Sequence, residues 1–357
     1  MFAVELLLTL AVSFAEPSDV AWLAEVTRPP ASIAHDDAFP IAPLLKTADG
    51  REITTSVDWL QRRTELLRAW TDLLGPMPER PKSSFEELAS EELAKCVRKR
   101  IRYECEAGLF VEAYLLIPLA PGRHPGVVAL HQTTGNTIDQ IAGVAGPDEQ
   151  QLGLKLAERG FVVICPRCFL WENTSSLPAA VETFRRRHPG ALGMKKMLHD
   201  AMRAVDLFEH VPQCDPRRIG SIGHSLGAKE VLYLAAFDER VKASVASEGG
   251  LTFRSTNWDA AWYLGEGLRR PGFARNHHEL LALAAPRPLL LIGGEKGSGA
   301  ADGLRSWELI AAAQPVYRLS HETVRLGLLN HGKGHSIPPD VFEKSVEWLR
   351  TYLGPKD

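Results

Sequence analysis

The sequence predicts an α/β protein in which a mostly parallel sheet of about eight strands is covered by helices on both faces. Between residues 126 and 353, short apolar runs alternate with longer stretches of helical spacing, which is the pattern of successive β-α-β units. A serine flanked by glycines, at residues 223–227, separates one such apolar run from the next helical stretch. The chain has 357 residues, of which 45% are hydrophobic, so it is long enough to bury a large core.

The first fifteen residues have the features of a secretory signal. An apolar run from Leu6 to Val12 ends in Ser13-Phe14-Ala15, with small residues where cleavage would occur. Glu5 is present and no Lys or Arg precedes the run, so an ordinary apolar N-terminal segment is the alternative. The run is too short to span a membrane. We therefore expect a secreted or periplasmic protein without a membrane span in the mature chain, and a cytoplasmic location as the alternative.

Residues 16–94 are expected to form an N-terminal arm and one helix packed on the core. Residues 17–50 are rich in Pro and Ala and show little periodicity, which predicts an extended arm. Apolar residues then recur near helical spacing over residues 56–74 and stop at Gly75-Pro76, which predicts an amphipathic helix.

Residues 95–357 are expected to form the sheet-containing domain. The runs at 95–103 and 109–118, joined by a turn at Ala107-Gly108, predict an antiparallel pair that opens the sheet. The later strands are predicted at 126–130, 161–164, 219–222, 241–247, 288–292 and 323–329, and the helices at 150–159, 197–210, 228–236, 306–313 and 340–353.

Composition and motifs exclude several classes of partner. The formal net charge of -3 gives no basic footprint for nucleic acid or for an anionic membrane surface. The sequence has no His-Glu-x-x-His motif, no Gly-x-Gly-x-x-Gly after a strand and no phosphate-binding loop. We therefore expect no metal ion and no organic cofactor.

The five cysteines are compatible with an exported protein. In an oxidising compartment, Cys96 and Cys105 could bridge neighbouring strand segments. Cys165 and Cys168 have the spacing of a redox motif, but they follow a strand and lack a redox-domain pattern around them. A structural role is the better interpretation for this pair.

The glycine-flanked serine is the strongest candidate for chemistry. Residues 223–227 read Gly-His-Ser-Leu-Gly, after the apolar run 219–222 and before a helix-forming run. The glycines leave room for a sharp strand-to-helix turn that exposes the serine hydroxyl. Ser225 is therefore the candidate nucleophile, and a serine in an ordinary turn is the alternative.

From residue 125 to residue 353 the sequence resembles the α/β-hydrolase superfamily. Within it, the similarity is to the dienelactone-hydrolase-like and carbohydrate-esterase branches, which include acetyl xylan esterases and glucuronoyl esterases. The segments that carry the resemblance are 131–135 (His-Gln-Thr-Thr-Gly), 200–206, 218–220, the serine turn, 235–240 and 285–288.

The resemblance implies the fold of that superfamily and a serine-dependent hydrolase that cleaves carboxylic esters through an acyl-enzyme. The expected substrate is a carbohydrate-linked or other small ester. The enzymatic alternatives are a dienelactone-type hydrolase and a serine peptidase. A catalytically inactive relative that binds a glycan or a protein is the alternative outside enzymes.

The general base is expected in the loop after the last strand, where this superfamily places its histidine. Two histidines lie there, His331 and His335. His335 follows a glycine in the form that resembles the family's histidine loop, so we predict it as the base. His331 is the reserve candidate, with a loop-stabilising role as its simpler explanation.

The acid that orients the histidine is left open between two positions. Many relatives read Gly-Glu-x-Asp after the next-to-last strand, but residues 294–297 read Gly-Glu-Lys-Gly. Glu248, with Lys229 four residues after the serine, resembles the glucuronoyl-esterase branch, in which a glutamate on this strand is the acid. Asp302 is the second candidate and Glu295 a weaker third. Turn or helix capping would equally explain Glu248 and Asp302.

The oxyanion hole and the substrate contacts follow from the same resemblance. The backbone N–H groups of Leu226 and of Gln132 or Thr133 are the expected oxyanion donors. Segments 168–196 and 251–283 are longer than a tight connection requires. From these and from the serine's helix we predict Lys229, Trp258 and Trp262 as substrate-binding residues, with packing inside a lid as the alternative.

Overall fold

The computed structural model describes residues 19–35, 39–172 and 176–354. These residues form one nine-stranded sheet in the order β1-β2-β3-β5-β4-β6-β7-β8-β9. Pairing is antiparallel between β1 and β2, between β2 and β3, and between β3 and β5. All the other pairs, from β5 through β4 to β9, are parallel. The strands are β1 (Glu86–Glu92), β2 (Cys96–Glu106), β3 (Leu109–Pro118), β4 (His124–Leu130), β5 (Val162–Pro166), β6 (Cys214–His224), β7 (Val241–Ser247), β8 (Leu289–Gly293) and β9 (Leu326–Asn330). The predicted fold class is therefore confirmed, with nine strands in place of about eight.

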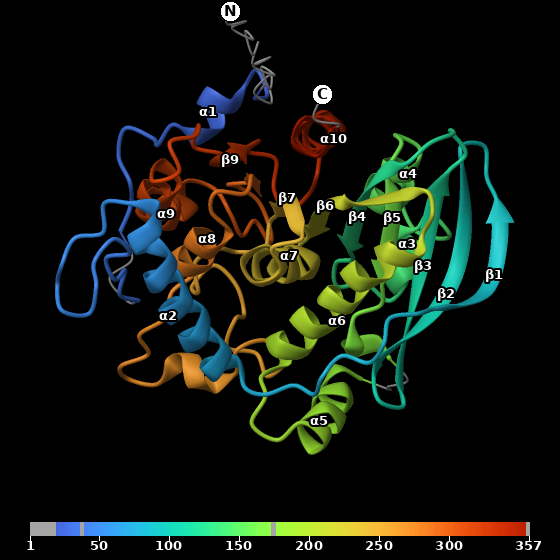
Figure 1. Cartoon of the computed structure of the whole chain (residues 1–357), viewed down its shortest axis with the longest axis horizontal. Coiled ribbons are helices and arrows are strands. Elements are labelled where there is room, and N and C mark those ends of the chain that lie inside the picture. Colours follow the sequence, from blue (N-terminus) through green and yellow to red (C-terminus); the bar gives the residue numbers. More distant parts are fainter. Residues whose placement is uncertain (1–18, 36–38, 173–175, 355–357) are drawn as a thin grey trace, which may run out of the picture.

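Helices cover both faces of the sheet (Figure 1). They are α1 (Leu23–Thr27), α2 (Ser56–Leu74), α3 (Thr137–Ile141), α4 (Leu152–Ala157), α5 (Leu177–Arg187), α6 (Gly193–Leu207), α7 (Leu226–Phe237), α8 (His278–Ala284), α9 (Trp307–Arg318) and α10 (Pro339–Leu353). Successive strand residues alternate between the two cores: Val128 and Leu130 pack with α6 and α7, and Val127 and Ala129 pack with α4 and α10. A strand buried on both faces is apolar throughout, as residues 127–130 of β4 are.

The strand missed by the sequence is β1. All seven of its residues are exposed, and four of them are glutamates, so it shows no apolar periodicity. It is held at the sheet edge by backbone pairing with β2 and by cross-strand ion pairs such as Arg102–Glu86 and Lys99–Glu87, each at 2.7 Å. Charges on an edge strand discourage pairing with other chains.

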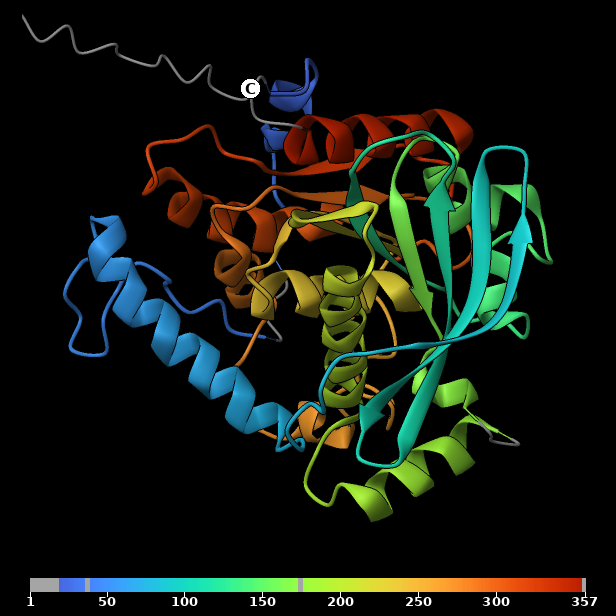
Figure 2. The same cartoon turned by 45° about the vertical axis from the view of Figure 1, so that its right-hand side comes forward.

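The N-terminal part packs on the core through α1 and α2, among other contacts. The α1 segment contributes Trp22, whose ring stacks on Trp348 of α10 at 5.9 Å. Helix α2 has the bounds that the sequence predicts: the Thr55 hydroxyl accepts the N–H of Asp58 at its start. It buries Trp70, whose Nε1 donates to Glu279 at 2.8 Å. Figure 2 shows α2 and β1 at opposite sides of the molecule. The predicted signal segment lies outside the described residues.

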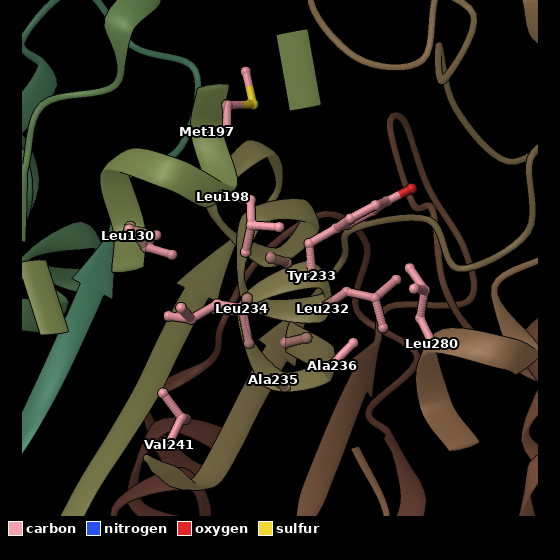
Figure 3. Packing of buried hydrophobic residues seen from close by; sticks show 14 of the residues in the cluster. Leu130, Met197, Leu198, Leu232, Tyr233, Leu234, Ala235, Ala236, Val241 and Leu280 are labelled. Atoms are coloured by element: carbon pink, nitrogen blue, oxygen red, sulfur yellow. The ribbon is translucent and has the colours of Figure 1, made fainter. Parts of the chain in front are cut away.

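Helix α7 lies at the centre of the molecule, and eleven of its twelve residues are buried. Figure 3 shows its side chains packed toward Leu130 of β4, Leu198 of α6 and Leu280 of α8. Apart from Lys229 and Glu230, α7 carries no charged residue, and a helix that is largely apolar on all sides must be enclosed by other elements. This enclosure fixes the first turn of α7, which directly follows Ser225.

The disulfide considered for Cys96 and Cys105 is wrong. Both residues lie on β2, nine positions apart, which separates them by about 30 Å in an extended strand. All five cysteines are buried free thiols. In the described part of the chain, no helix has the length and apolarity needed to cross a membrane.

Candidate active site

Ser225 occupies a sharp turn between β6 and α7. Its backbone has φ 57° and ψ -115°, a region that costs about 1–3 kcal/mol for a residue with a side chain. The turn is held by the Ser225 N–H, which donates to the Ser247 carbonyl at 2.8 Å. A Cβ at Gly223 would lie 2.4 Å from the Gly227 carbonyl, and one at Gly227 would lie 2.0 Å from the Leu130 oxygen. Both glycines are therefore required for this turn.

Ser225, His335 and Glu248 line one cavity of about 150 Å³. They follow β6, β9 and β7, and the carboxyl ends of these parallel strands meet at one edge of the sheet. The cavity is completed by Thr133, Leu170, Trp171, Leu177, Leu226, Lys229, Thr256, Asn257, Trp262 and Tyr263. The predicted nucleophile and the predicted base thus share one pocket.

Glu248 contacts the imidazole of His335. The distance from His335 Nδ1 to Glu248 Oε2 is 3.3 Å. The Glu248 side chain is buried, and its two oxygens also accept the backbone N–H groups of Gly294 and Ala301. These bonds fix the carboxylate, and its contact with Nδ1 leaves Nε2 of His335 for other partners.

Asp302 and Glu295 are engaged elsewhere. The Asp302 carboxylate accepts the N–H groups of Gly250 and Leu251, both at 2.7 Å, and the Ser306 hydroxyl at 2.8 Å. Burial raises its pKa. Glu295 accepts the Leu304 N–H at 2.6 Å and the Asn330 amide at 2.8 Å. These contacts anchor the start of the 251–283 segment and the 294–304 loop.

His331, the reserve candidate for the base, stabilises its own loop. Its Nδ1 accepts the Lys333 N–H at 3.1 Å, and its backbone N–H donates to Gly293 at 2.9 Å. Burial lowers its pKa. These contacts fit the loop-stabilising role that was the simpler of the two explanations for His331.

The loop after β4 is held by His131. Its Nδ1 lies 2.8 Å from the Gln132 carbonyl and donates to it, since its Nε2 accepts the Cys168 N–H at 3.1 Å. Burial lowers the pKa of His131 to about 4, so the ring is neutral. Thr133 and Leu226 border the cavity of Ser225, and Gln132 borders a smaller neighbouring cavity.

Comparisons with known proteins agree on the fold. Residues 111–261 match the model of the dienelactone hydrolase family. The putative hydrolase YtaP of Bacillus subtilis is 24% identical over 306 residues, which span 82% of this chain and 99% of that protein. A glucuronoyl esterase from Solibacter usitatus superposes with a TM-score of 0.73 and 19% identity, covering 91% of this chain and 100% of that one. A glucuronoyl esterase of family CE15 from Teredinibacter turnerae gives 0.70 and 20%, covering 90% and 93%.

The chain has the α/β-hydrolase fold. Both the matched family and YtaP are described as hydrolases, which supports hydrolysis as the class of reaction.

Lys229 lies one helical turn after Ser225 and borders the same cavity. Its ammonium donates to the Gly249 carbonyl and the Thr256 hydroxyl, and it lies 3.9 Å from the centre of the Trp258 ring. Burial lowers the pKa of Lys229 to about 7, although the negative charge of Asp302 acts in the opposite direction and raises it. Two of its three N–H groups are used by these acceptors.

The prediction that Trp258 binds substrate is wrong for this structure. Trp258 is completely buried, and its Nε1 donates to the Gly250 carbonyl at 2.6 Å. Its ring packs under the Lys229 ammonium and against the buried His277. An apolar ring this large gains more from enclosure than from a surface position. Trp262 does border the cavity.

Sequence reasoning missed His224, which precedes the serine. Its ring centre lies 4.7 Å from that of His335, and its Nδ1 lies 3.1 Å from the Ser247 hydroxyl. Burial, followed by the charges of His335 and His331, lowers the pKa of His224 to about 3. His335 therefore packs against an uncharged ring. The only signal in the sequence was the position of His224 inside the serine motif.

Proposed function

We propose that this α/β-hydrolase is a serine-dependent carboxylic ester hydrolase that works through an acyl-enzyme. The observation that carries the proposal is the convergence of Ser225, His335 and Glu248 on one cavity, with the buried Glu248 carboxylate 3.3 Å from Nδ1 of His335. A serine needs a base within reach and a group that orients the base. The three strand ends supply one residue for each role.

In the proposed mechanism, the Ser225 hydroxyl attacks the ester carbonyl while Nε2 of His335 takes its proton. Glu248 accepts the Nδ1–H and stabilises the imidazolium that forms. The Leu226 N–H and an N–H of the 132–133 loop donate to the oxyanion, each contributing about 3 kcal/mol. The intermediate collapses as His335 protonates the leaving alcohol. Water, deprotonated by His335, then hydrolyses the acyl-enzyme and releases Ser225.

For the substrate we propose an ester of a carbohydrate acid. The cavity is small and has aromatic walls at Trp171, Trp262 and Tyr263, which suit the flat face of one sugar ring. The third N–H of Lys229 is the donor for an oxygen on that ring. Two solved structures with this fold are glucuronoyl esterases, which favours a uronate ester over an acetyl or feruloyl ester.

Hydrolysis of a small panel tests the proposal. The purified protein is assayed on p-nitrophenyl acetate, methyl glucuronate, acetylated xylan and a feruloyl ester, with Ser225→Ala as the matched control. We expect turnover of p-nitrophenyl acetate that is lost in Ser225→Ala, and the highest kcat/KM among the natural esters for methyl glucuronate. Equal rates for both proteins would refute the serine mechanism. A dienelactone and a peptide are added to the panel, and faster turnover of either one than of these four esters would favour the other hydrolase classes.

A further inference from the structure

A second cavity, which we call the arginine groove, lies beside the catalytic one. It has a volume of about 930 Å³ and is bordered by Leu73 at the end of α2, Arg185 of α5, Arg269, Arg270 and Phe273. Figure 1 shows α5, the end of α2 and the orange segment before α8 along the lower edge of the molecule.

The two cavities share one wall. In segment 257–264, Asn257, Trp262 and Tyr263 border the catalytic cavity, and Ala260, Ala261 and Leu264 border the arginine groove. Helix α6 begins against this wall: the Gly193 Cα faces the Trp262 carbonyl so closely that a Cβ there would lie 2.4 Å from it. The arginine groove and the catalytic cavity are therefore separated by this one short segment.

The groove carries guanidinium groups without internal partners. Three arginines and two carboxylates, Asp259 and Glu266, border it, so its formal charge is 3 - 2 = +1. Asp259 pairs with Arg269. Among the described residues, the side chains of Arg185 and Arg270 have no ion pair or hydrogen bond. Both are exposed, so holding two like charges in one groove gains nothing for folding.

We propose that the arginine groove binds carboxylate-bearing sugar units of a polymeric substrate whose ester lies at Ser225. This proposal rests on the proposed function and adds the class of polymer that the enzyme recognises, namely one with free carboxylates on its sugar units. A guanidinium presents two parallel N–H donors that match the two oxygens of a carboxylate. The Phe273 ring and the backbone of residues 271–272 supply a surface for a pyranose ring. The volume lies within the range of sites that enclose small ligands.

Binding is measured without turnover, so that it is independent of the catalytic proposal. The Ser225→Ala protein is titrated calorimetrically with trigalacturonate, and with xylotriose as the neutral probe. Arg185→Gln and Arg270→Gln are then introduced together in that background. The matched control is Arg186→Gln, because Arg186 lies on the same helix, is exposed and pairs with Glu182 outside the groove. Melting temperatures confirm that each variant is folded.

We expect trigalacturonate to bind more tightly than xylotriose and its Kd to rise with salt. The double variant should raise that Kd by about tenfold, or about 1.4 kcal/mol, and Arg186→Gln should leave it unchanged. No binding of trigalacturonate, equal binding of xylotriose, or an equal loss in Arg186→Gln would overturn the proposal. No step of this experiment involves ester cleavage. A wild-type enzyme without esterase activity would therefore refute the proposed function, whereas the measured Kd for trigalacturonate decides the proposal for the arginine groove.

Discussion

Replacing Glu248 by glutamine tests the assignment of the acid in the proposed triad. The carboxylate is buried, lies 3.3 Å from His335 Nδ1 and is held by two backbone N–H groups. Glutamine keeps the size of the side chain and removes its charge. The imidazolium that forms during catalysis would then face a neutral amide at a buried position.

The size of the effect follows from the geometry. Neutralising the acid of a well-formed triad lowers kcat by about 10⁴, and 3.3 Å is a long hydrogen bond. We therefore expect a fall of about 10³ to 10⁴, or about 4–5.5 kcal/mol of transition-state stabilisation. The amide must also turn its NH₂ toward Gly294 or Ala301, both of which donate. The unfolding free energy should fall by about 1–3 kcal/mol as a result.

Asp302→Asn is the matched comparison, since Asp302 is equally buried and also accepts two backbone N–H groups. It should lose stability by a similar amount and keep most of its kcat. Rates on p-nitrophenyl acetate are measured well below the melting temperature of both variants. If Asp302→Asn lowers kcat as much as Glu248→Gln does, or if Glu248→Gln stays within about tenfold of the wild type, the assignment of Glu248 is refuted.

Three further predictions concern groups around this site. Lys229 has a pKa of about 7 in the folded chain and about 10.4 in the unfolded chain. Between these pH values the unfolded chain binds more protons than the folded chain. The wild type therefore gains stability as pH rises from about 7 to about 10. Lys229→Met lacks this gain, so its melting temperature should fall relative to that of the wild type between pH 7 and pH 10. Calorimetry that shows a constant difference between the two melting temperatures would contradict this. His131→Phe removes both bonds that hold the 132–133 loop and should lower kcat about a hundredfold with a smaller change in KM; an unchanged kcat in steady-state assays would show that the loop does not depend on His131. All five cysteines should react with a thiol reagent in denaturant without prior reduction, and a count of three or fewer would indicate a disulfide.

Much of the fold was predictable because its signals are local. The helix over 56–74 and the strand over 109–118 were predicted with the bounds that the structure shows, since apolar periodicity and a glycine or proline mark their ends. The turn at Ser225 was predictable for the same reason: two glycines and two flanking apolar elements lie within one short stretch. Strand β1 was not, because its exposed residues show no apolar periodicity and its position depends on pairing with β2.

The site was only partly predictable because it depends on contacts between distant residues. The sequence narrowed the acid to Glu248 or Asp302, and only the folded chain brings Glu248 next to His335, 87 positions away. Trp258 illustrates the opposite failure. A tryptophan in a long connection suggests an exposed platform, but the segment folds inward and the ring is enclosed by Lys229, Tyr263 and His277.

The central claim is that Ser225 is a nucleophile activated by His335, and covalent labelling tests it most directly. The wild-type protein and His335→Ala are treated with a fluorophosphonate, digested, and the adduct is located by mass spectrometry. We predict one adduct on Ser225 in the wild type, and labelling at least about a hundredfold slower in His335→Ala. A wild-type protein that stays unlabelled, or that is labelled at a different serine, would contradict the account.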